Sequence, residues 1–140
     1  MRPEQIKRLQ GSFDQVWVTG GVATLFYDRL FLIDPHTRSL FSADMESQKM
    51  KFTSMLASVI GLIERQSMFT SIIEDLGRRH ARYGVAETDY EAVGRALMWS
   101  LEQSLANEFT NEVRSDWLAL FENVRDIMIR ASRQSLNAEQ

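Results

Sequence analysis

Apolar side chains recur along this chain at intervals of three and four residues, which is the spacing that one face of an α-helix requires. The first two such segments cover residues 6–17 and 22–33, and the pair Gly20-Gly21 separates them. The second segment must end near Asp34, because the residue before Pro35 is pushed out of the helical region. The pattern therefore predicts two helices joined by a glycine turn.

Two further segments, 52–63 and 69–82, keep the same spacing, and Gly84 is placed to cap the latter in the left-handed conformation. The sequence Thr88-Asp89-Tyr90-Glu91 is typical of a capping box and predicts the start of a fifth helix. Thr110 is placed to open the last helix. The sequence thus predicts an all-α fold of about six helices.

All connections between these segments are short, so residues 1–140 are predicted to form one domain, with 135–140 as a frayed tail. The chain has no cysteine, which excludes disulfides, thiolate metal sites and covalent haem attachment through cysteine. The formal net charge of −3 does not indicate a protein that binds nucleic acid. The charged start of the chain and the lack of a long apolar run predict neither a signal peptide nor a membrane span, and a cytoplasmic location is expected.

A histidine interrupts one of the apolar faces. His80 lies on the stripe that includes Phe69, Ile73 and Leu76, while charged residues occupy the other side of that helix. A neutral imidazole facing an apolar space is the usual ligand that holds haem iron from one side. A core histidine that bonds a carbonyl, or one that complements the dipole at a helix end, would show the same spacing.

Two other polar side chains interrupt apolar faces. Gln48 lies one turn before Phe52, and its amide can donate and accept hydrogen bonds. Tyr27 adjoins Phe26 and Leu30, so its ring can be buried while its hydroxyl seeks a partner. Each could be ordinary by itself: a half-exposed amide near a helix start, and a core tyrosine. Together with His80 they describe a cavity with a metal ligand on one wall and hydrogen-bond donors on another.

Three segments around these positions share a specific pattern. Residues 25–31, LFYDRLF, contain Tyr27; Phe41 follows six residues after Pro35; and residues 76–85, LGRRHARYGV, contain His80. The combination resembles the globin family, in particular the bacterial single-domain haemoglobins and the haem domain of flavohaemoglobins. The resemblance extends over residues 5–132 and implies the globin fold, a three-over-three helical sandwich.

The resemblance also implies a cofactor, non-covalent haem b, with His80 as the ligand of its iron. It makes Tyr27 and Gln48 the distal groups that stabilise a bound gas. The other residues that it places around the haem are Phe41 and Phe52 on its faces, Leu76 and Val85 beside His80, Tyr90 near the proximal ligand, and Lys51, Arg79 and Arg82 within reach of the propionates.

The function implied by the resemblance is reversible binding of dioxygen, with carbon monoxide and nitric oxide as further ligands. Two distal donors predict high affinity and slow release, which suits scavenging or chemistry with nitric oxide better than bulk oxygen transport. Conversion of nitric oxide to nitrate, a nitric oxide dioxygenase activity, would require an external reductase. The last helix has Ala131-Ser132-Arg133-Gln134 where flavohaemoglobins carry a glutamate beside the proximal histidine, which argues against strong electron donation by His80.

Three other functions remain open on the sequence. One is a stand-alone haem-based gas sensor, which would signal through a partner surface. Another is a globin-fold regulatory protein without haem, against which the joint presence of His80, Tyr27 and Phe41 argues. The third is a helical interaction module that uses Trp99, which lies off the apolar stripe of its helix and is expected to be exposed.

Overall fold

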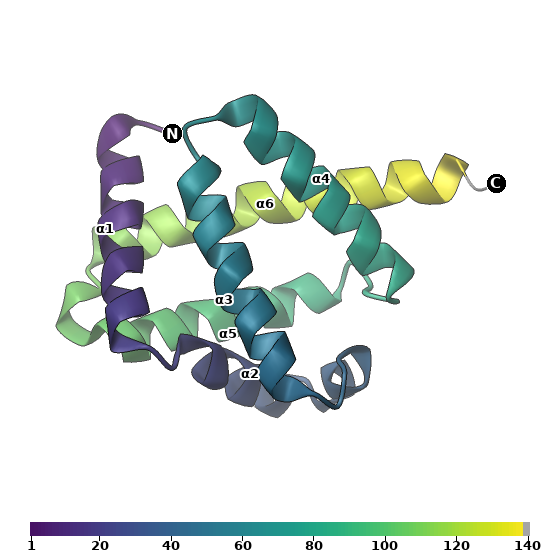
Figure 1. The fold of residues 1–140 in the computed structure, drawn as a ribbon, viewed down its shortest axis with the longest axis horizontal. Coiled ribbons are helices and arrows are strands. Elements are labelled where there is room, and N and C mark those ends of the chain that lie inside the picture. The colour runs from purple at the N-terminus through teal and green to yellow at the C-terminus, as the bar shows by residue number, and fades with distance from the viewer. Residues whose placement is uncertain (139–140) are drawn as a thin grey trace.

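The computed structural model describes the backbone of residues 1–138 and the side chains of residues 1–134 (Figure 1). Within these residues the chain forms six α-helices, two short 3₁₀ helices and no strand. The elements are α1 (Pro3–Thr19), α2 (Val22–Ile33), η1 (Pro35–Leu40), α3 (Met45–Leu62), α4 (Gln66–Arg82), α5 (Asp89–Leu105), η2 (Ala106–Glu108) and α6 (Asn111–Ala138).

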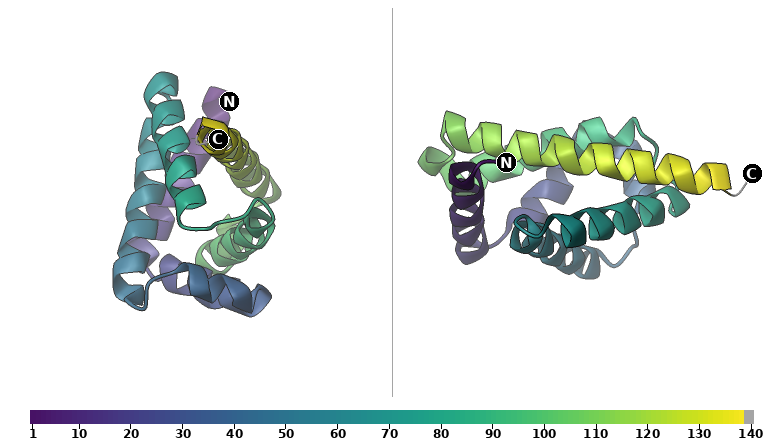
Figure 2. Two further views of the ribbon diagram at one scale, coloured as in Figure 1. Left: turned by 90° about the vertical axis from the view of Figure 1, so that its right-hand side faces the viewer. Right: turned by 90° about the horizontal axis from the view of Figure 1, so that it is seen from above.

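The helices pack in two layers around one core. Figure 2 shows α3 and α4 on one side of the molecule and α5 and α6 on the other. The most extensive pairings are α4 with α6 and α2 with α5, and α1 contacts α3, α5 and α6. This arrangement confirms the predicted all-α, three-over-three sandwich.

Several predicted helix boundaries are confirmed by backbone geometry. Gly20 and Gly21 both have positive φ angles, of 73° and 77°, and together they turn the chain from α1 into α2. Gly84 follows α4 with a φ of 91°, in the left-handed region that suits glycine. The Thr110 hydroxyl accepts a hydrogen bond from the Val113 amide at 3.2 Å and so caps the start of α6.

The predicted capping box at Thr88 is wrong. Thr88 itself has helical backbone angles, φ −68° and ψ −21°, and its side chain accepts no capping hydrogen bond. A capping hydroxyl needs an extended backbone to reach the first free amides. Instead, the carboxylate of Asp89 accepts a hydrogen bond at 2.7 Å from the Ala86 amide, which closes the turn before α5.

One other expectation differs from the structure. Trp17, which follows the helical spacing of the first segment, is 59% exposed and lies two residues before the end of α1. The expected frayed tail, 135–140, stays a prediction: the described backbone of α6 continues to Ala138, and the last two residues lie outside those described. Among the described residues no single helix is long and apolar enough to cross a membrane; the pair α1 and α2 passes that test only together and is bent by 94°.

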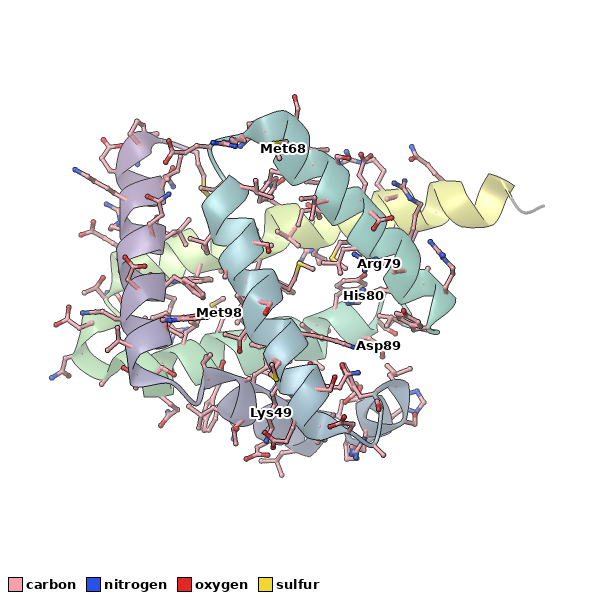
Figure 3. The ribbon with its side chains drawn as sticks, in the orientation of Figure 1. Lys49, Met68, Arg79, His80, Asp89 and Met98 are labelled. Atoms are coloured by element: carbon pink, nitrogen blue, oxygen red, sulfur yellow. The ribbon has the colours of Figure 1, made fainter. Side chains whose placement is uncertain are left out.

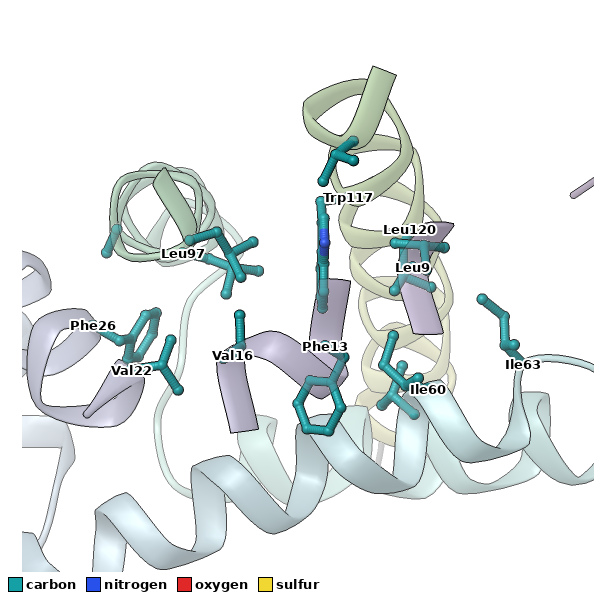
Figure 4. Packing of buried hydrophobic residues seen from close by; sticks show 14 of the residues in the cluster. Leu9, Phe13, Val16, Val22, Phe26, Ile60, Ile63, Leu97, Trp117 and Leu120 are labelled. Carbon is teal, nitrogen blue, oxygen red and sulfur yellow. The ribbon is translucent and has the colours of Figure 1, made fainter. Parts of the chain in front are cut away.

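The core is centred on Trp117, whose indole is directed towards Phe13 of α1 (Figure 4). The indole is 1% exposed, and its Nε1–H donates to the buried Ser12 hydroxyl at 2.8 Å. That hydroxyl in turn donates to the Leu9 carbonyl at 3.0 Å. The one polar atom of the largest buried side chain is therefore satisfied by α1, which ties the first helix to the last.

This bond predicts the cost of removing the Ser12 hydroxyl. The Ser12→Ala variant leaves the buried indole N–H of Trp117 without a partner, which is expected to lower the free energy of unfolding by about 1–3 kcal/mol in a urea titration. Ser104→Ala is the matched control, because the buried Ser104 hydroxyl has no hydrogen-bond partner within the described residues. The control is expected to stay within about 0.5 kcal/mol of the wild type. Equal losses in the two variants would contradict the assigned role of the Ser12 bond.

Candidate functional site

Helix α4 presents two lines of side chains to the interior, each with a spacing of four residues. The buried line is Phe69, Ile73 and Gly77, and the half-buried line is Ile72, Leu76 and His80. Residues four apart lie above one another on a helix. The half-buried line therefore lies at the edge of the core, where its side chains are only partly covered. The imidazole of His80 is at the C-terminal end of this line.

The imidazole of His80 is held by its own helix. Its Nδ1 lies 2.9 Å from the carbonyl oxygen of Leu76, one turn earlier. A carbonyl can only accept, so Nδ1 carries the proton and the lone pair is on Nε2. Figure 3 shows His80 on the side of α4 that faces the middle of the molecule; His80 is half-buried, whereas the adjacent Arg79 is exposed. This tautomer leaves Nε2 free to bind a metal.

Burial keeps that ring neutral. Desolvation lowers the pKa of His80 below its ordinary value of 6.5, and the positive charge of Arg79 lowers it further, while the Leu76 carbonyl acts in the opposite direction. The ring is therefore uncharged at neutral pH, as a metal ligand must be.

The backbone just after His80 is also fixed. The amide of Val85 donates to the His80 carbonyl, and the amide of Gly84 donates to the Ala81 carbonyl, both at 3.1 Å. With the positive φ of Gly84, this pair of bonds is a Schellman motif. The last turn of α4, which carries the imidazole, therefore has a defined end.

Tyr27 lies at the centre of an aromatic cluster. Its ring makes edge-on contacts with Phe26, Phe41 and Phe52, with centroids 5.0, 5.2 and 5.7 Å away, and a tilted contact with Phe31 at 5.8 Å. The Phe26 ring also stacks on Phe52 at 4.2 Å. These rings come from α2, the segment after η1, and α3, and edge-to-face geometry is the favourable one for aromatic pairs. The tyrosine ring is thus oriented by four neighbours.

The Tyr27 hydroxyl is protonated and makes only a weak hydrogen bond. Burial raises the pKa of Tyr27 to about 12, so the hydroxyl is a donor at neutral pH. Its acceptor in the structure is the main-chain carbonyl of Gln48, at the long distance of 3.5 Å. A bond of that length is weak. Gln48 is half-buried on α3, so the structure brings Tyr27 to the backbone of the predicted distal glutamine.

The chain matches the globin family model over residues 24–128, which is 105 of its 140 residues. It belongs to the globin family. Among curated relatives, the flavohemoproteins of Rhizobium meliloti (strain 1021) and Bordetella pertussis are 26% and 25% identical over 106 and 111 residues, and these alignments cover 74% and 77% of this globin. They cover 26% and 28% of the relatives, so this globin spans about a quarter of their length. Neuroglobin of Danio rerio is 23% identical over 120 residues, 76% of each chain.

Membership in this family implies haem binding, and the residues of this globin fit that group. A proximal histidine is the one protein ligand that globin haem requires, and His80 offers a free, neutral Nε2. Within residues 1–138 no three His, Asp or Glu side chains gather to form another kind of metal centre. His80 would therefore supply the one protein nitrogen that a haem iron needs.

The structure places the remaining predicted site residues as follows. Leu76 and Val85 are half-buried; the Leu76 carbonyl bonds the imidazole of His80, and the Val85 amide bonds the His80 carbonyl, while their predicted contact with haem stays a prediction. Tyr90 is buried, and burial with the charges of Asp89 and Glu87 raises its pKa to about 12, but no hydrogen bond joins it to His80 within the described residues. The Nδ1 partner is the Leu76 carbonyl instead.

The three cations predicted near the propionates are on the surface. Lys51 and Arg82 are exposed, and Arg79 pairs with Asp75 at 3.1 Å, one turn earlier on α4. Trp99 was expected to be exposed and is half-buried, since the Arg29 guanidinium lies over its ring at 4.8 Å from the centroid. One face of the Trp99 ring is therefore covered by a cation–π contact within the chain.

Some residues that shape the site were not singled out in the sequence. Phe26 and Phe31 orient Tyr27, and Gly77 sets the contact of α4 with α6. The only signal in the sequence was that these residues lie in the segments 25–31 and 76–85, which also contain Tyr27 and His80. Helical spacing alone does not show which side chain another residue will contact. A separate cavity of about 430 Å³ lies between the end of α1 and the starts of α2 and α3, lined in part by Trp17 and Met50, and it contains none of the predicted site residues.

Proposed function

We propose that this globin binds haem b through the Nε2 of His80 and holds dioxygen reversibly with high affinity. When bound, haem supplies an iron atom with an open position for a diatomic gas. The observation that carries the proposal is the pairing of a neutral imidazole, whose free nitrogen is fixed by Leu76, with a buried tyrosine donor on a different helix.

The protein side of the chemistry is charge stabilisation and exclusion of water. A gas ligand that drew negative charge from the iron would be stabilised by a donor fixed in advance in a site of low dielectric constant. The four rings around Tyr27 fix its phenol, and the 3.5 Å bond to Gln48 costs little to give up. The amide of Gln48 supplies a second donor from α3.

We also propose that the same pocket converts nitric oxide to nitrate when an external reductase is present. The likeness to flavohemoproteins over about a quarter of their length supports this proposal, as does the tyrosine donor. The Glu87–Arg133 ion pair joins the loop before α5 to α6, and residues 131–134 of α6 include no acidic side chain that could partner the proximal histidine. We therefore expect oxygen binding to be stronger than any peroxidase-like activity.

Absorption spectroscopy of the purified protein tests the haem proposal. The protein is expressed with a haem precursor in the medium, and spectra are taken in the ferric state and after reduction under carbon monoxide. We expect an intense Soret band that shifts with carbon monoxide. A colourless protein that also fails to take up added haem would contradict haem binding and favour a regulatory globin without haem.

A further inference from the structure

We propose that Gly77 is a positioning residue for His80. Because Gly77 has no side chain, α4 can lie close to α6, and this close packing determines the position of the imidazole relative to the haem. This inference rests on the proposed role of His80 as the iron ligand. Gly77 is buried, and it lies next to Leu76 and three residues before His80 on α4.

The contact at Gly77 is between two backbones. A Cβ placed there would lie 2.5 Å from the Met128 carbonyl oxygen and 2.6 Å from the Met128 Cα, both in the backbone of α6. Ordinary contacts of a Cβ begin near 3.4 Å. No change of rotamer relieves a clash with backbone atoms, so an added methyl group must push α4 away from α6 by about 1 Å.

A displacement of that size at Gly77 reaches the imidazole directly. Leu76, whose carbonyl holds Nδ1, is the neighbouring residue, and His80 lies less than one turn further along the same helix. Leu76 precedes Gly77 and His80 follows it, so a displacement of α4 at Gly77 changes the position of the ring relative to the carbonyl that orients it. A metal site tolerates little displacement of its ligands, because a shift of about 1 Å is enough to weaken the bond between a side chain and the metal.

Other glycines in the chain provide matched controls. Gly94 of α5 also makes a close approach, since a Cβ there would lie 2.6 Å from the Phe121 ring of α6, but it lies on a different helix from His80. Gly61 of α3 has no atom within 4 Å of the added Cβ. Gly94→Ala therefore adds a comparably short contact, against a side chain, on a helix other than α4, and Gly61→Ala makes the same substitution without crowding.

The experiment compares Gly77→Ala, Gly94→Ala and Gly61→Ala in two forms of the full chain. In the haem-free protein, ¹⁵N spectra report the tautomer of His80, which is readily assigned because the only other histidine is the exposed His36. In the haem-loaded ferrous protein, resonance Raman spectra report the iron–histidine stretching frequency, and transfer to an acceptor protein reports the rate of haem loss.

We expect Gly77→Ala to mix the His80 tautomers, to shift the iron–histidine frequency and to speed haem loss by about 10- to 100-fold, the range typical of outer partners of a metal ligand. Gly94→Ala is expected to lower stability only, and Gly61→Ala to change none of these readouts. If Gly77→Ala loses stability but keeps the wild-type tautomer or frequency, the positioning role is overturned and Gly77 serves packing alone.

A measurement on the wild type keeps the inference testable if Gly77→Ala does not fold. The haem-loaded protein must retain the contact, so nuclear Overhauser effects between the α-protons of Gly77 and Met128 are expected. Their absence in the loaded protein overturns the inference. If the wild type binds no haem, the proposed function fails, and the tautomer measurement on the haem-free variants still decides whether Gly77 positions the ring.

Discussion

Replacing His80 with alanine is expected to weaken haem binding by more than about 100-fold, beyond the range for loss of an outer partner of a metal ligand. The reason is that His80 offers the single neutral nitrogen of the proximal side, and its Nδ1 bond to Leu76 has already fixed the tautomer that leaves Nε2 free. The purified variant should lack the wild-type Soret band and show no iron–histidine stretch after haem is added.

Two controls separate loss of the ligand from loss of the fold. His36→Ala removes the other histidine, which is exposed on η1, and should leave the spectrum unchanged. His80→Gly with free imidazole in the buffer should regain a five-coordinate ferrous spectrum, because the small molecule can occupy the vacated space. A His80→Ala protein with an unaltered proximal spectrum would show that another residue binds the iron.

One contact bears on both alternatives that the sequence left open for His80. Spacing alone could not separate a ligand from a core histidine bonded to a carbonyl, since both place the ring on the apolar face. The structure contains the carbonyl bond, to Leu76, and that bond uses only Nδ1. The bond therefore fits a core histidine, and it also leaves the ring in the tautomer that a metal ligand needs.

The fold was largely predictable, because helical spacing and glycine turns are local signals. One error came where two local signals compete, and another where burial depends on neighbouring helices. At Thr88 the hydroxyl and the neighbouring carboxylate of Asp89 are both capping groups, and the carboxylate bonds the Ala86 amide. Trp17 fits the stripe of α1, but its exposure depends on where the neighbouring helices end, which periodicity does not report.

Only the residues of the candidate site that lie in recognisable sequence motifs could be predicted. The distal motif marked Tyr27, but the ring contacts that orient it come from three elements and depend on tertiary packing. Gly77 is similar, since its importance lies in the proximity of Met128, 51 positions later in the chain. Long-range contacts of this kind leave no periodic trace in a single sequence.

Replacing Tyr27 with phenylalanine is expected to speed dioxygen release from the haem-loaded protein by about 10- to 150-fold. A hydrogen bond to a group that carries charge contributes about 1.5–3 kcal/mol, and each 1.4 kcal/mol is a factor of about ten. The substitution keeps the ring and therefore its contacts with the four phenylalanines. Stopped-flow displacement of dioxygen by carbon monoxide measures the rate directly.

The hydroxyl itself is tested by comparison with other variants. Tyr83→Phe removes a hydroxyl from a 69% exposed ring and should leave the rate unchanged. Gln48→Leu should act in the same direction as Tyr27→Phe but more weakly, because a flexible amide loses more conformational freedom when it is held in place. Carbon monoxide takes up less charge than dioxygen, so its release should respond less to Tyr27→Phe. An unchanged dioxygen rate in Tyr27→Phe together with a large increase in Gln48→Leu would make the amide the main donor, and the tyrosine would then serve to orient α3 through its bond to the Gln48 carbonyl.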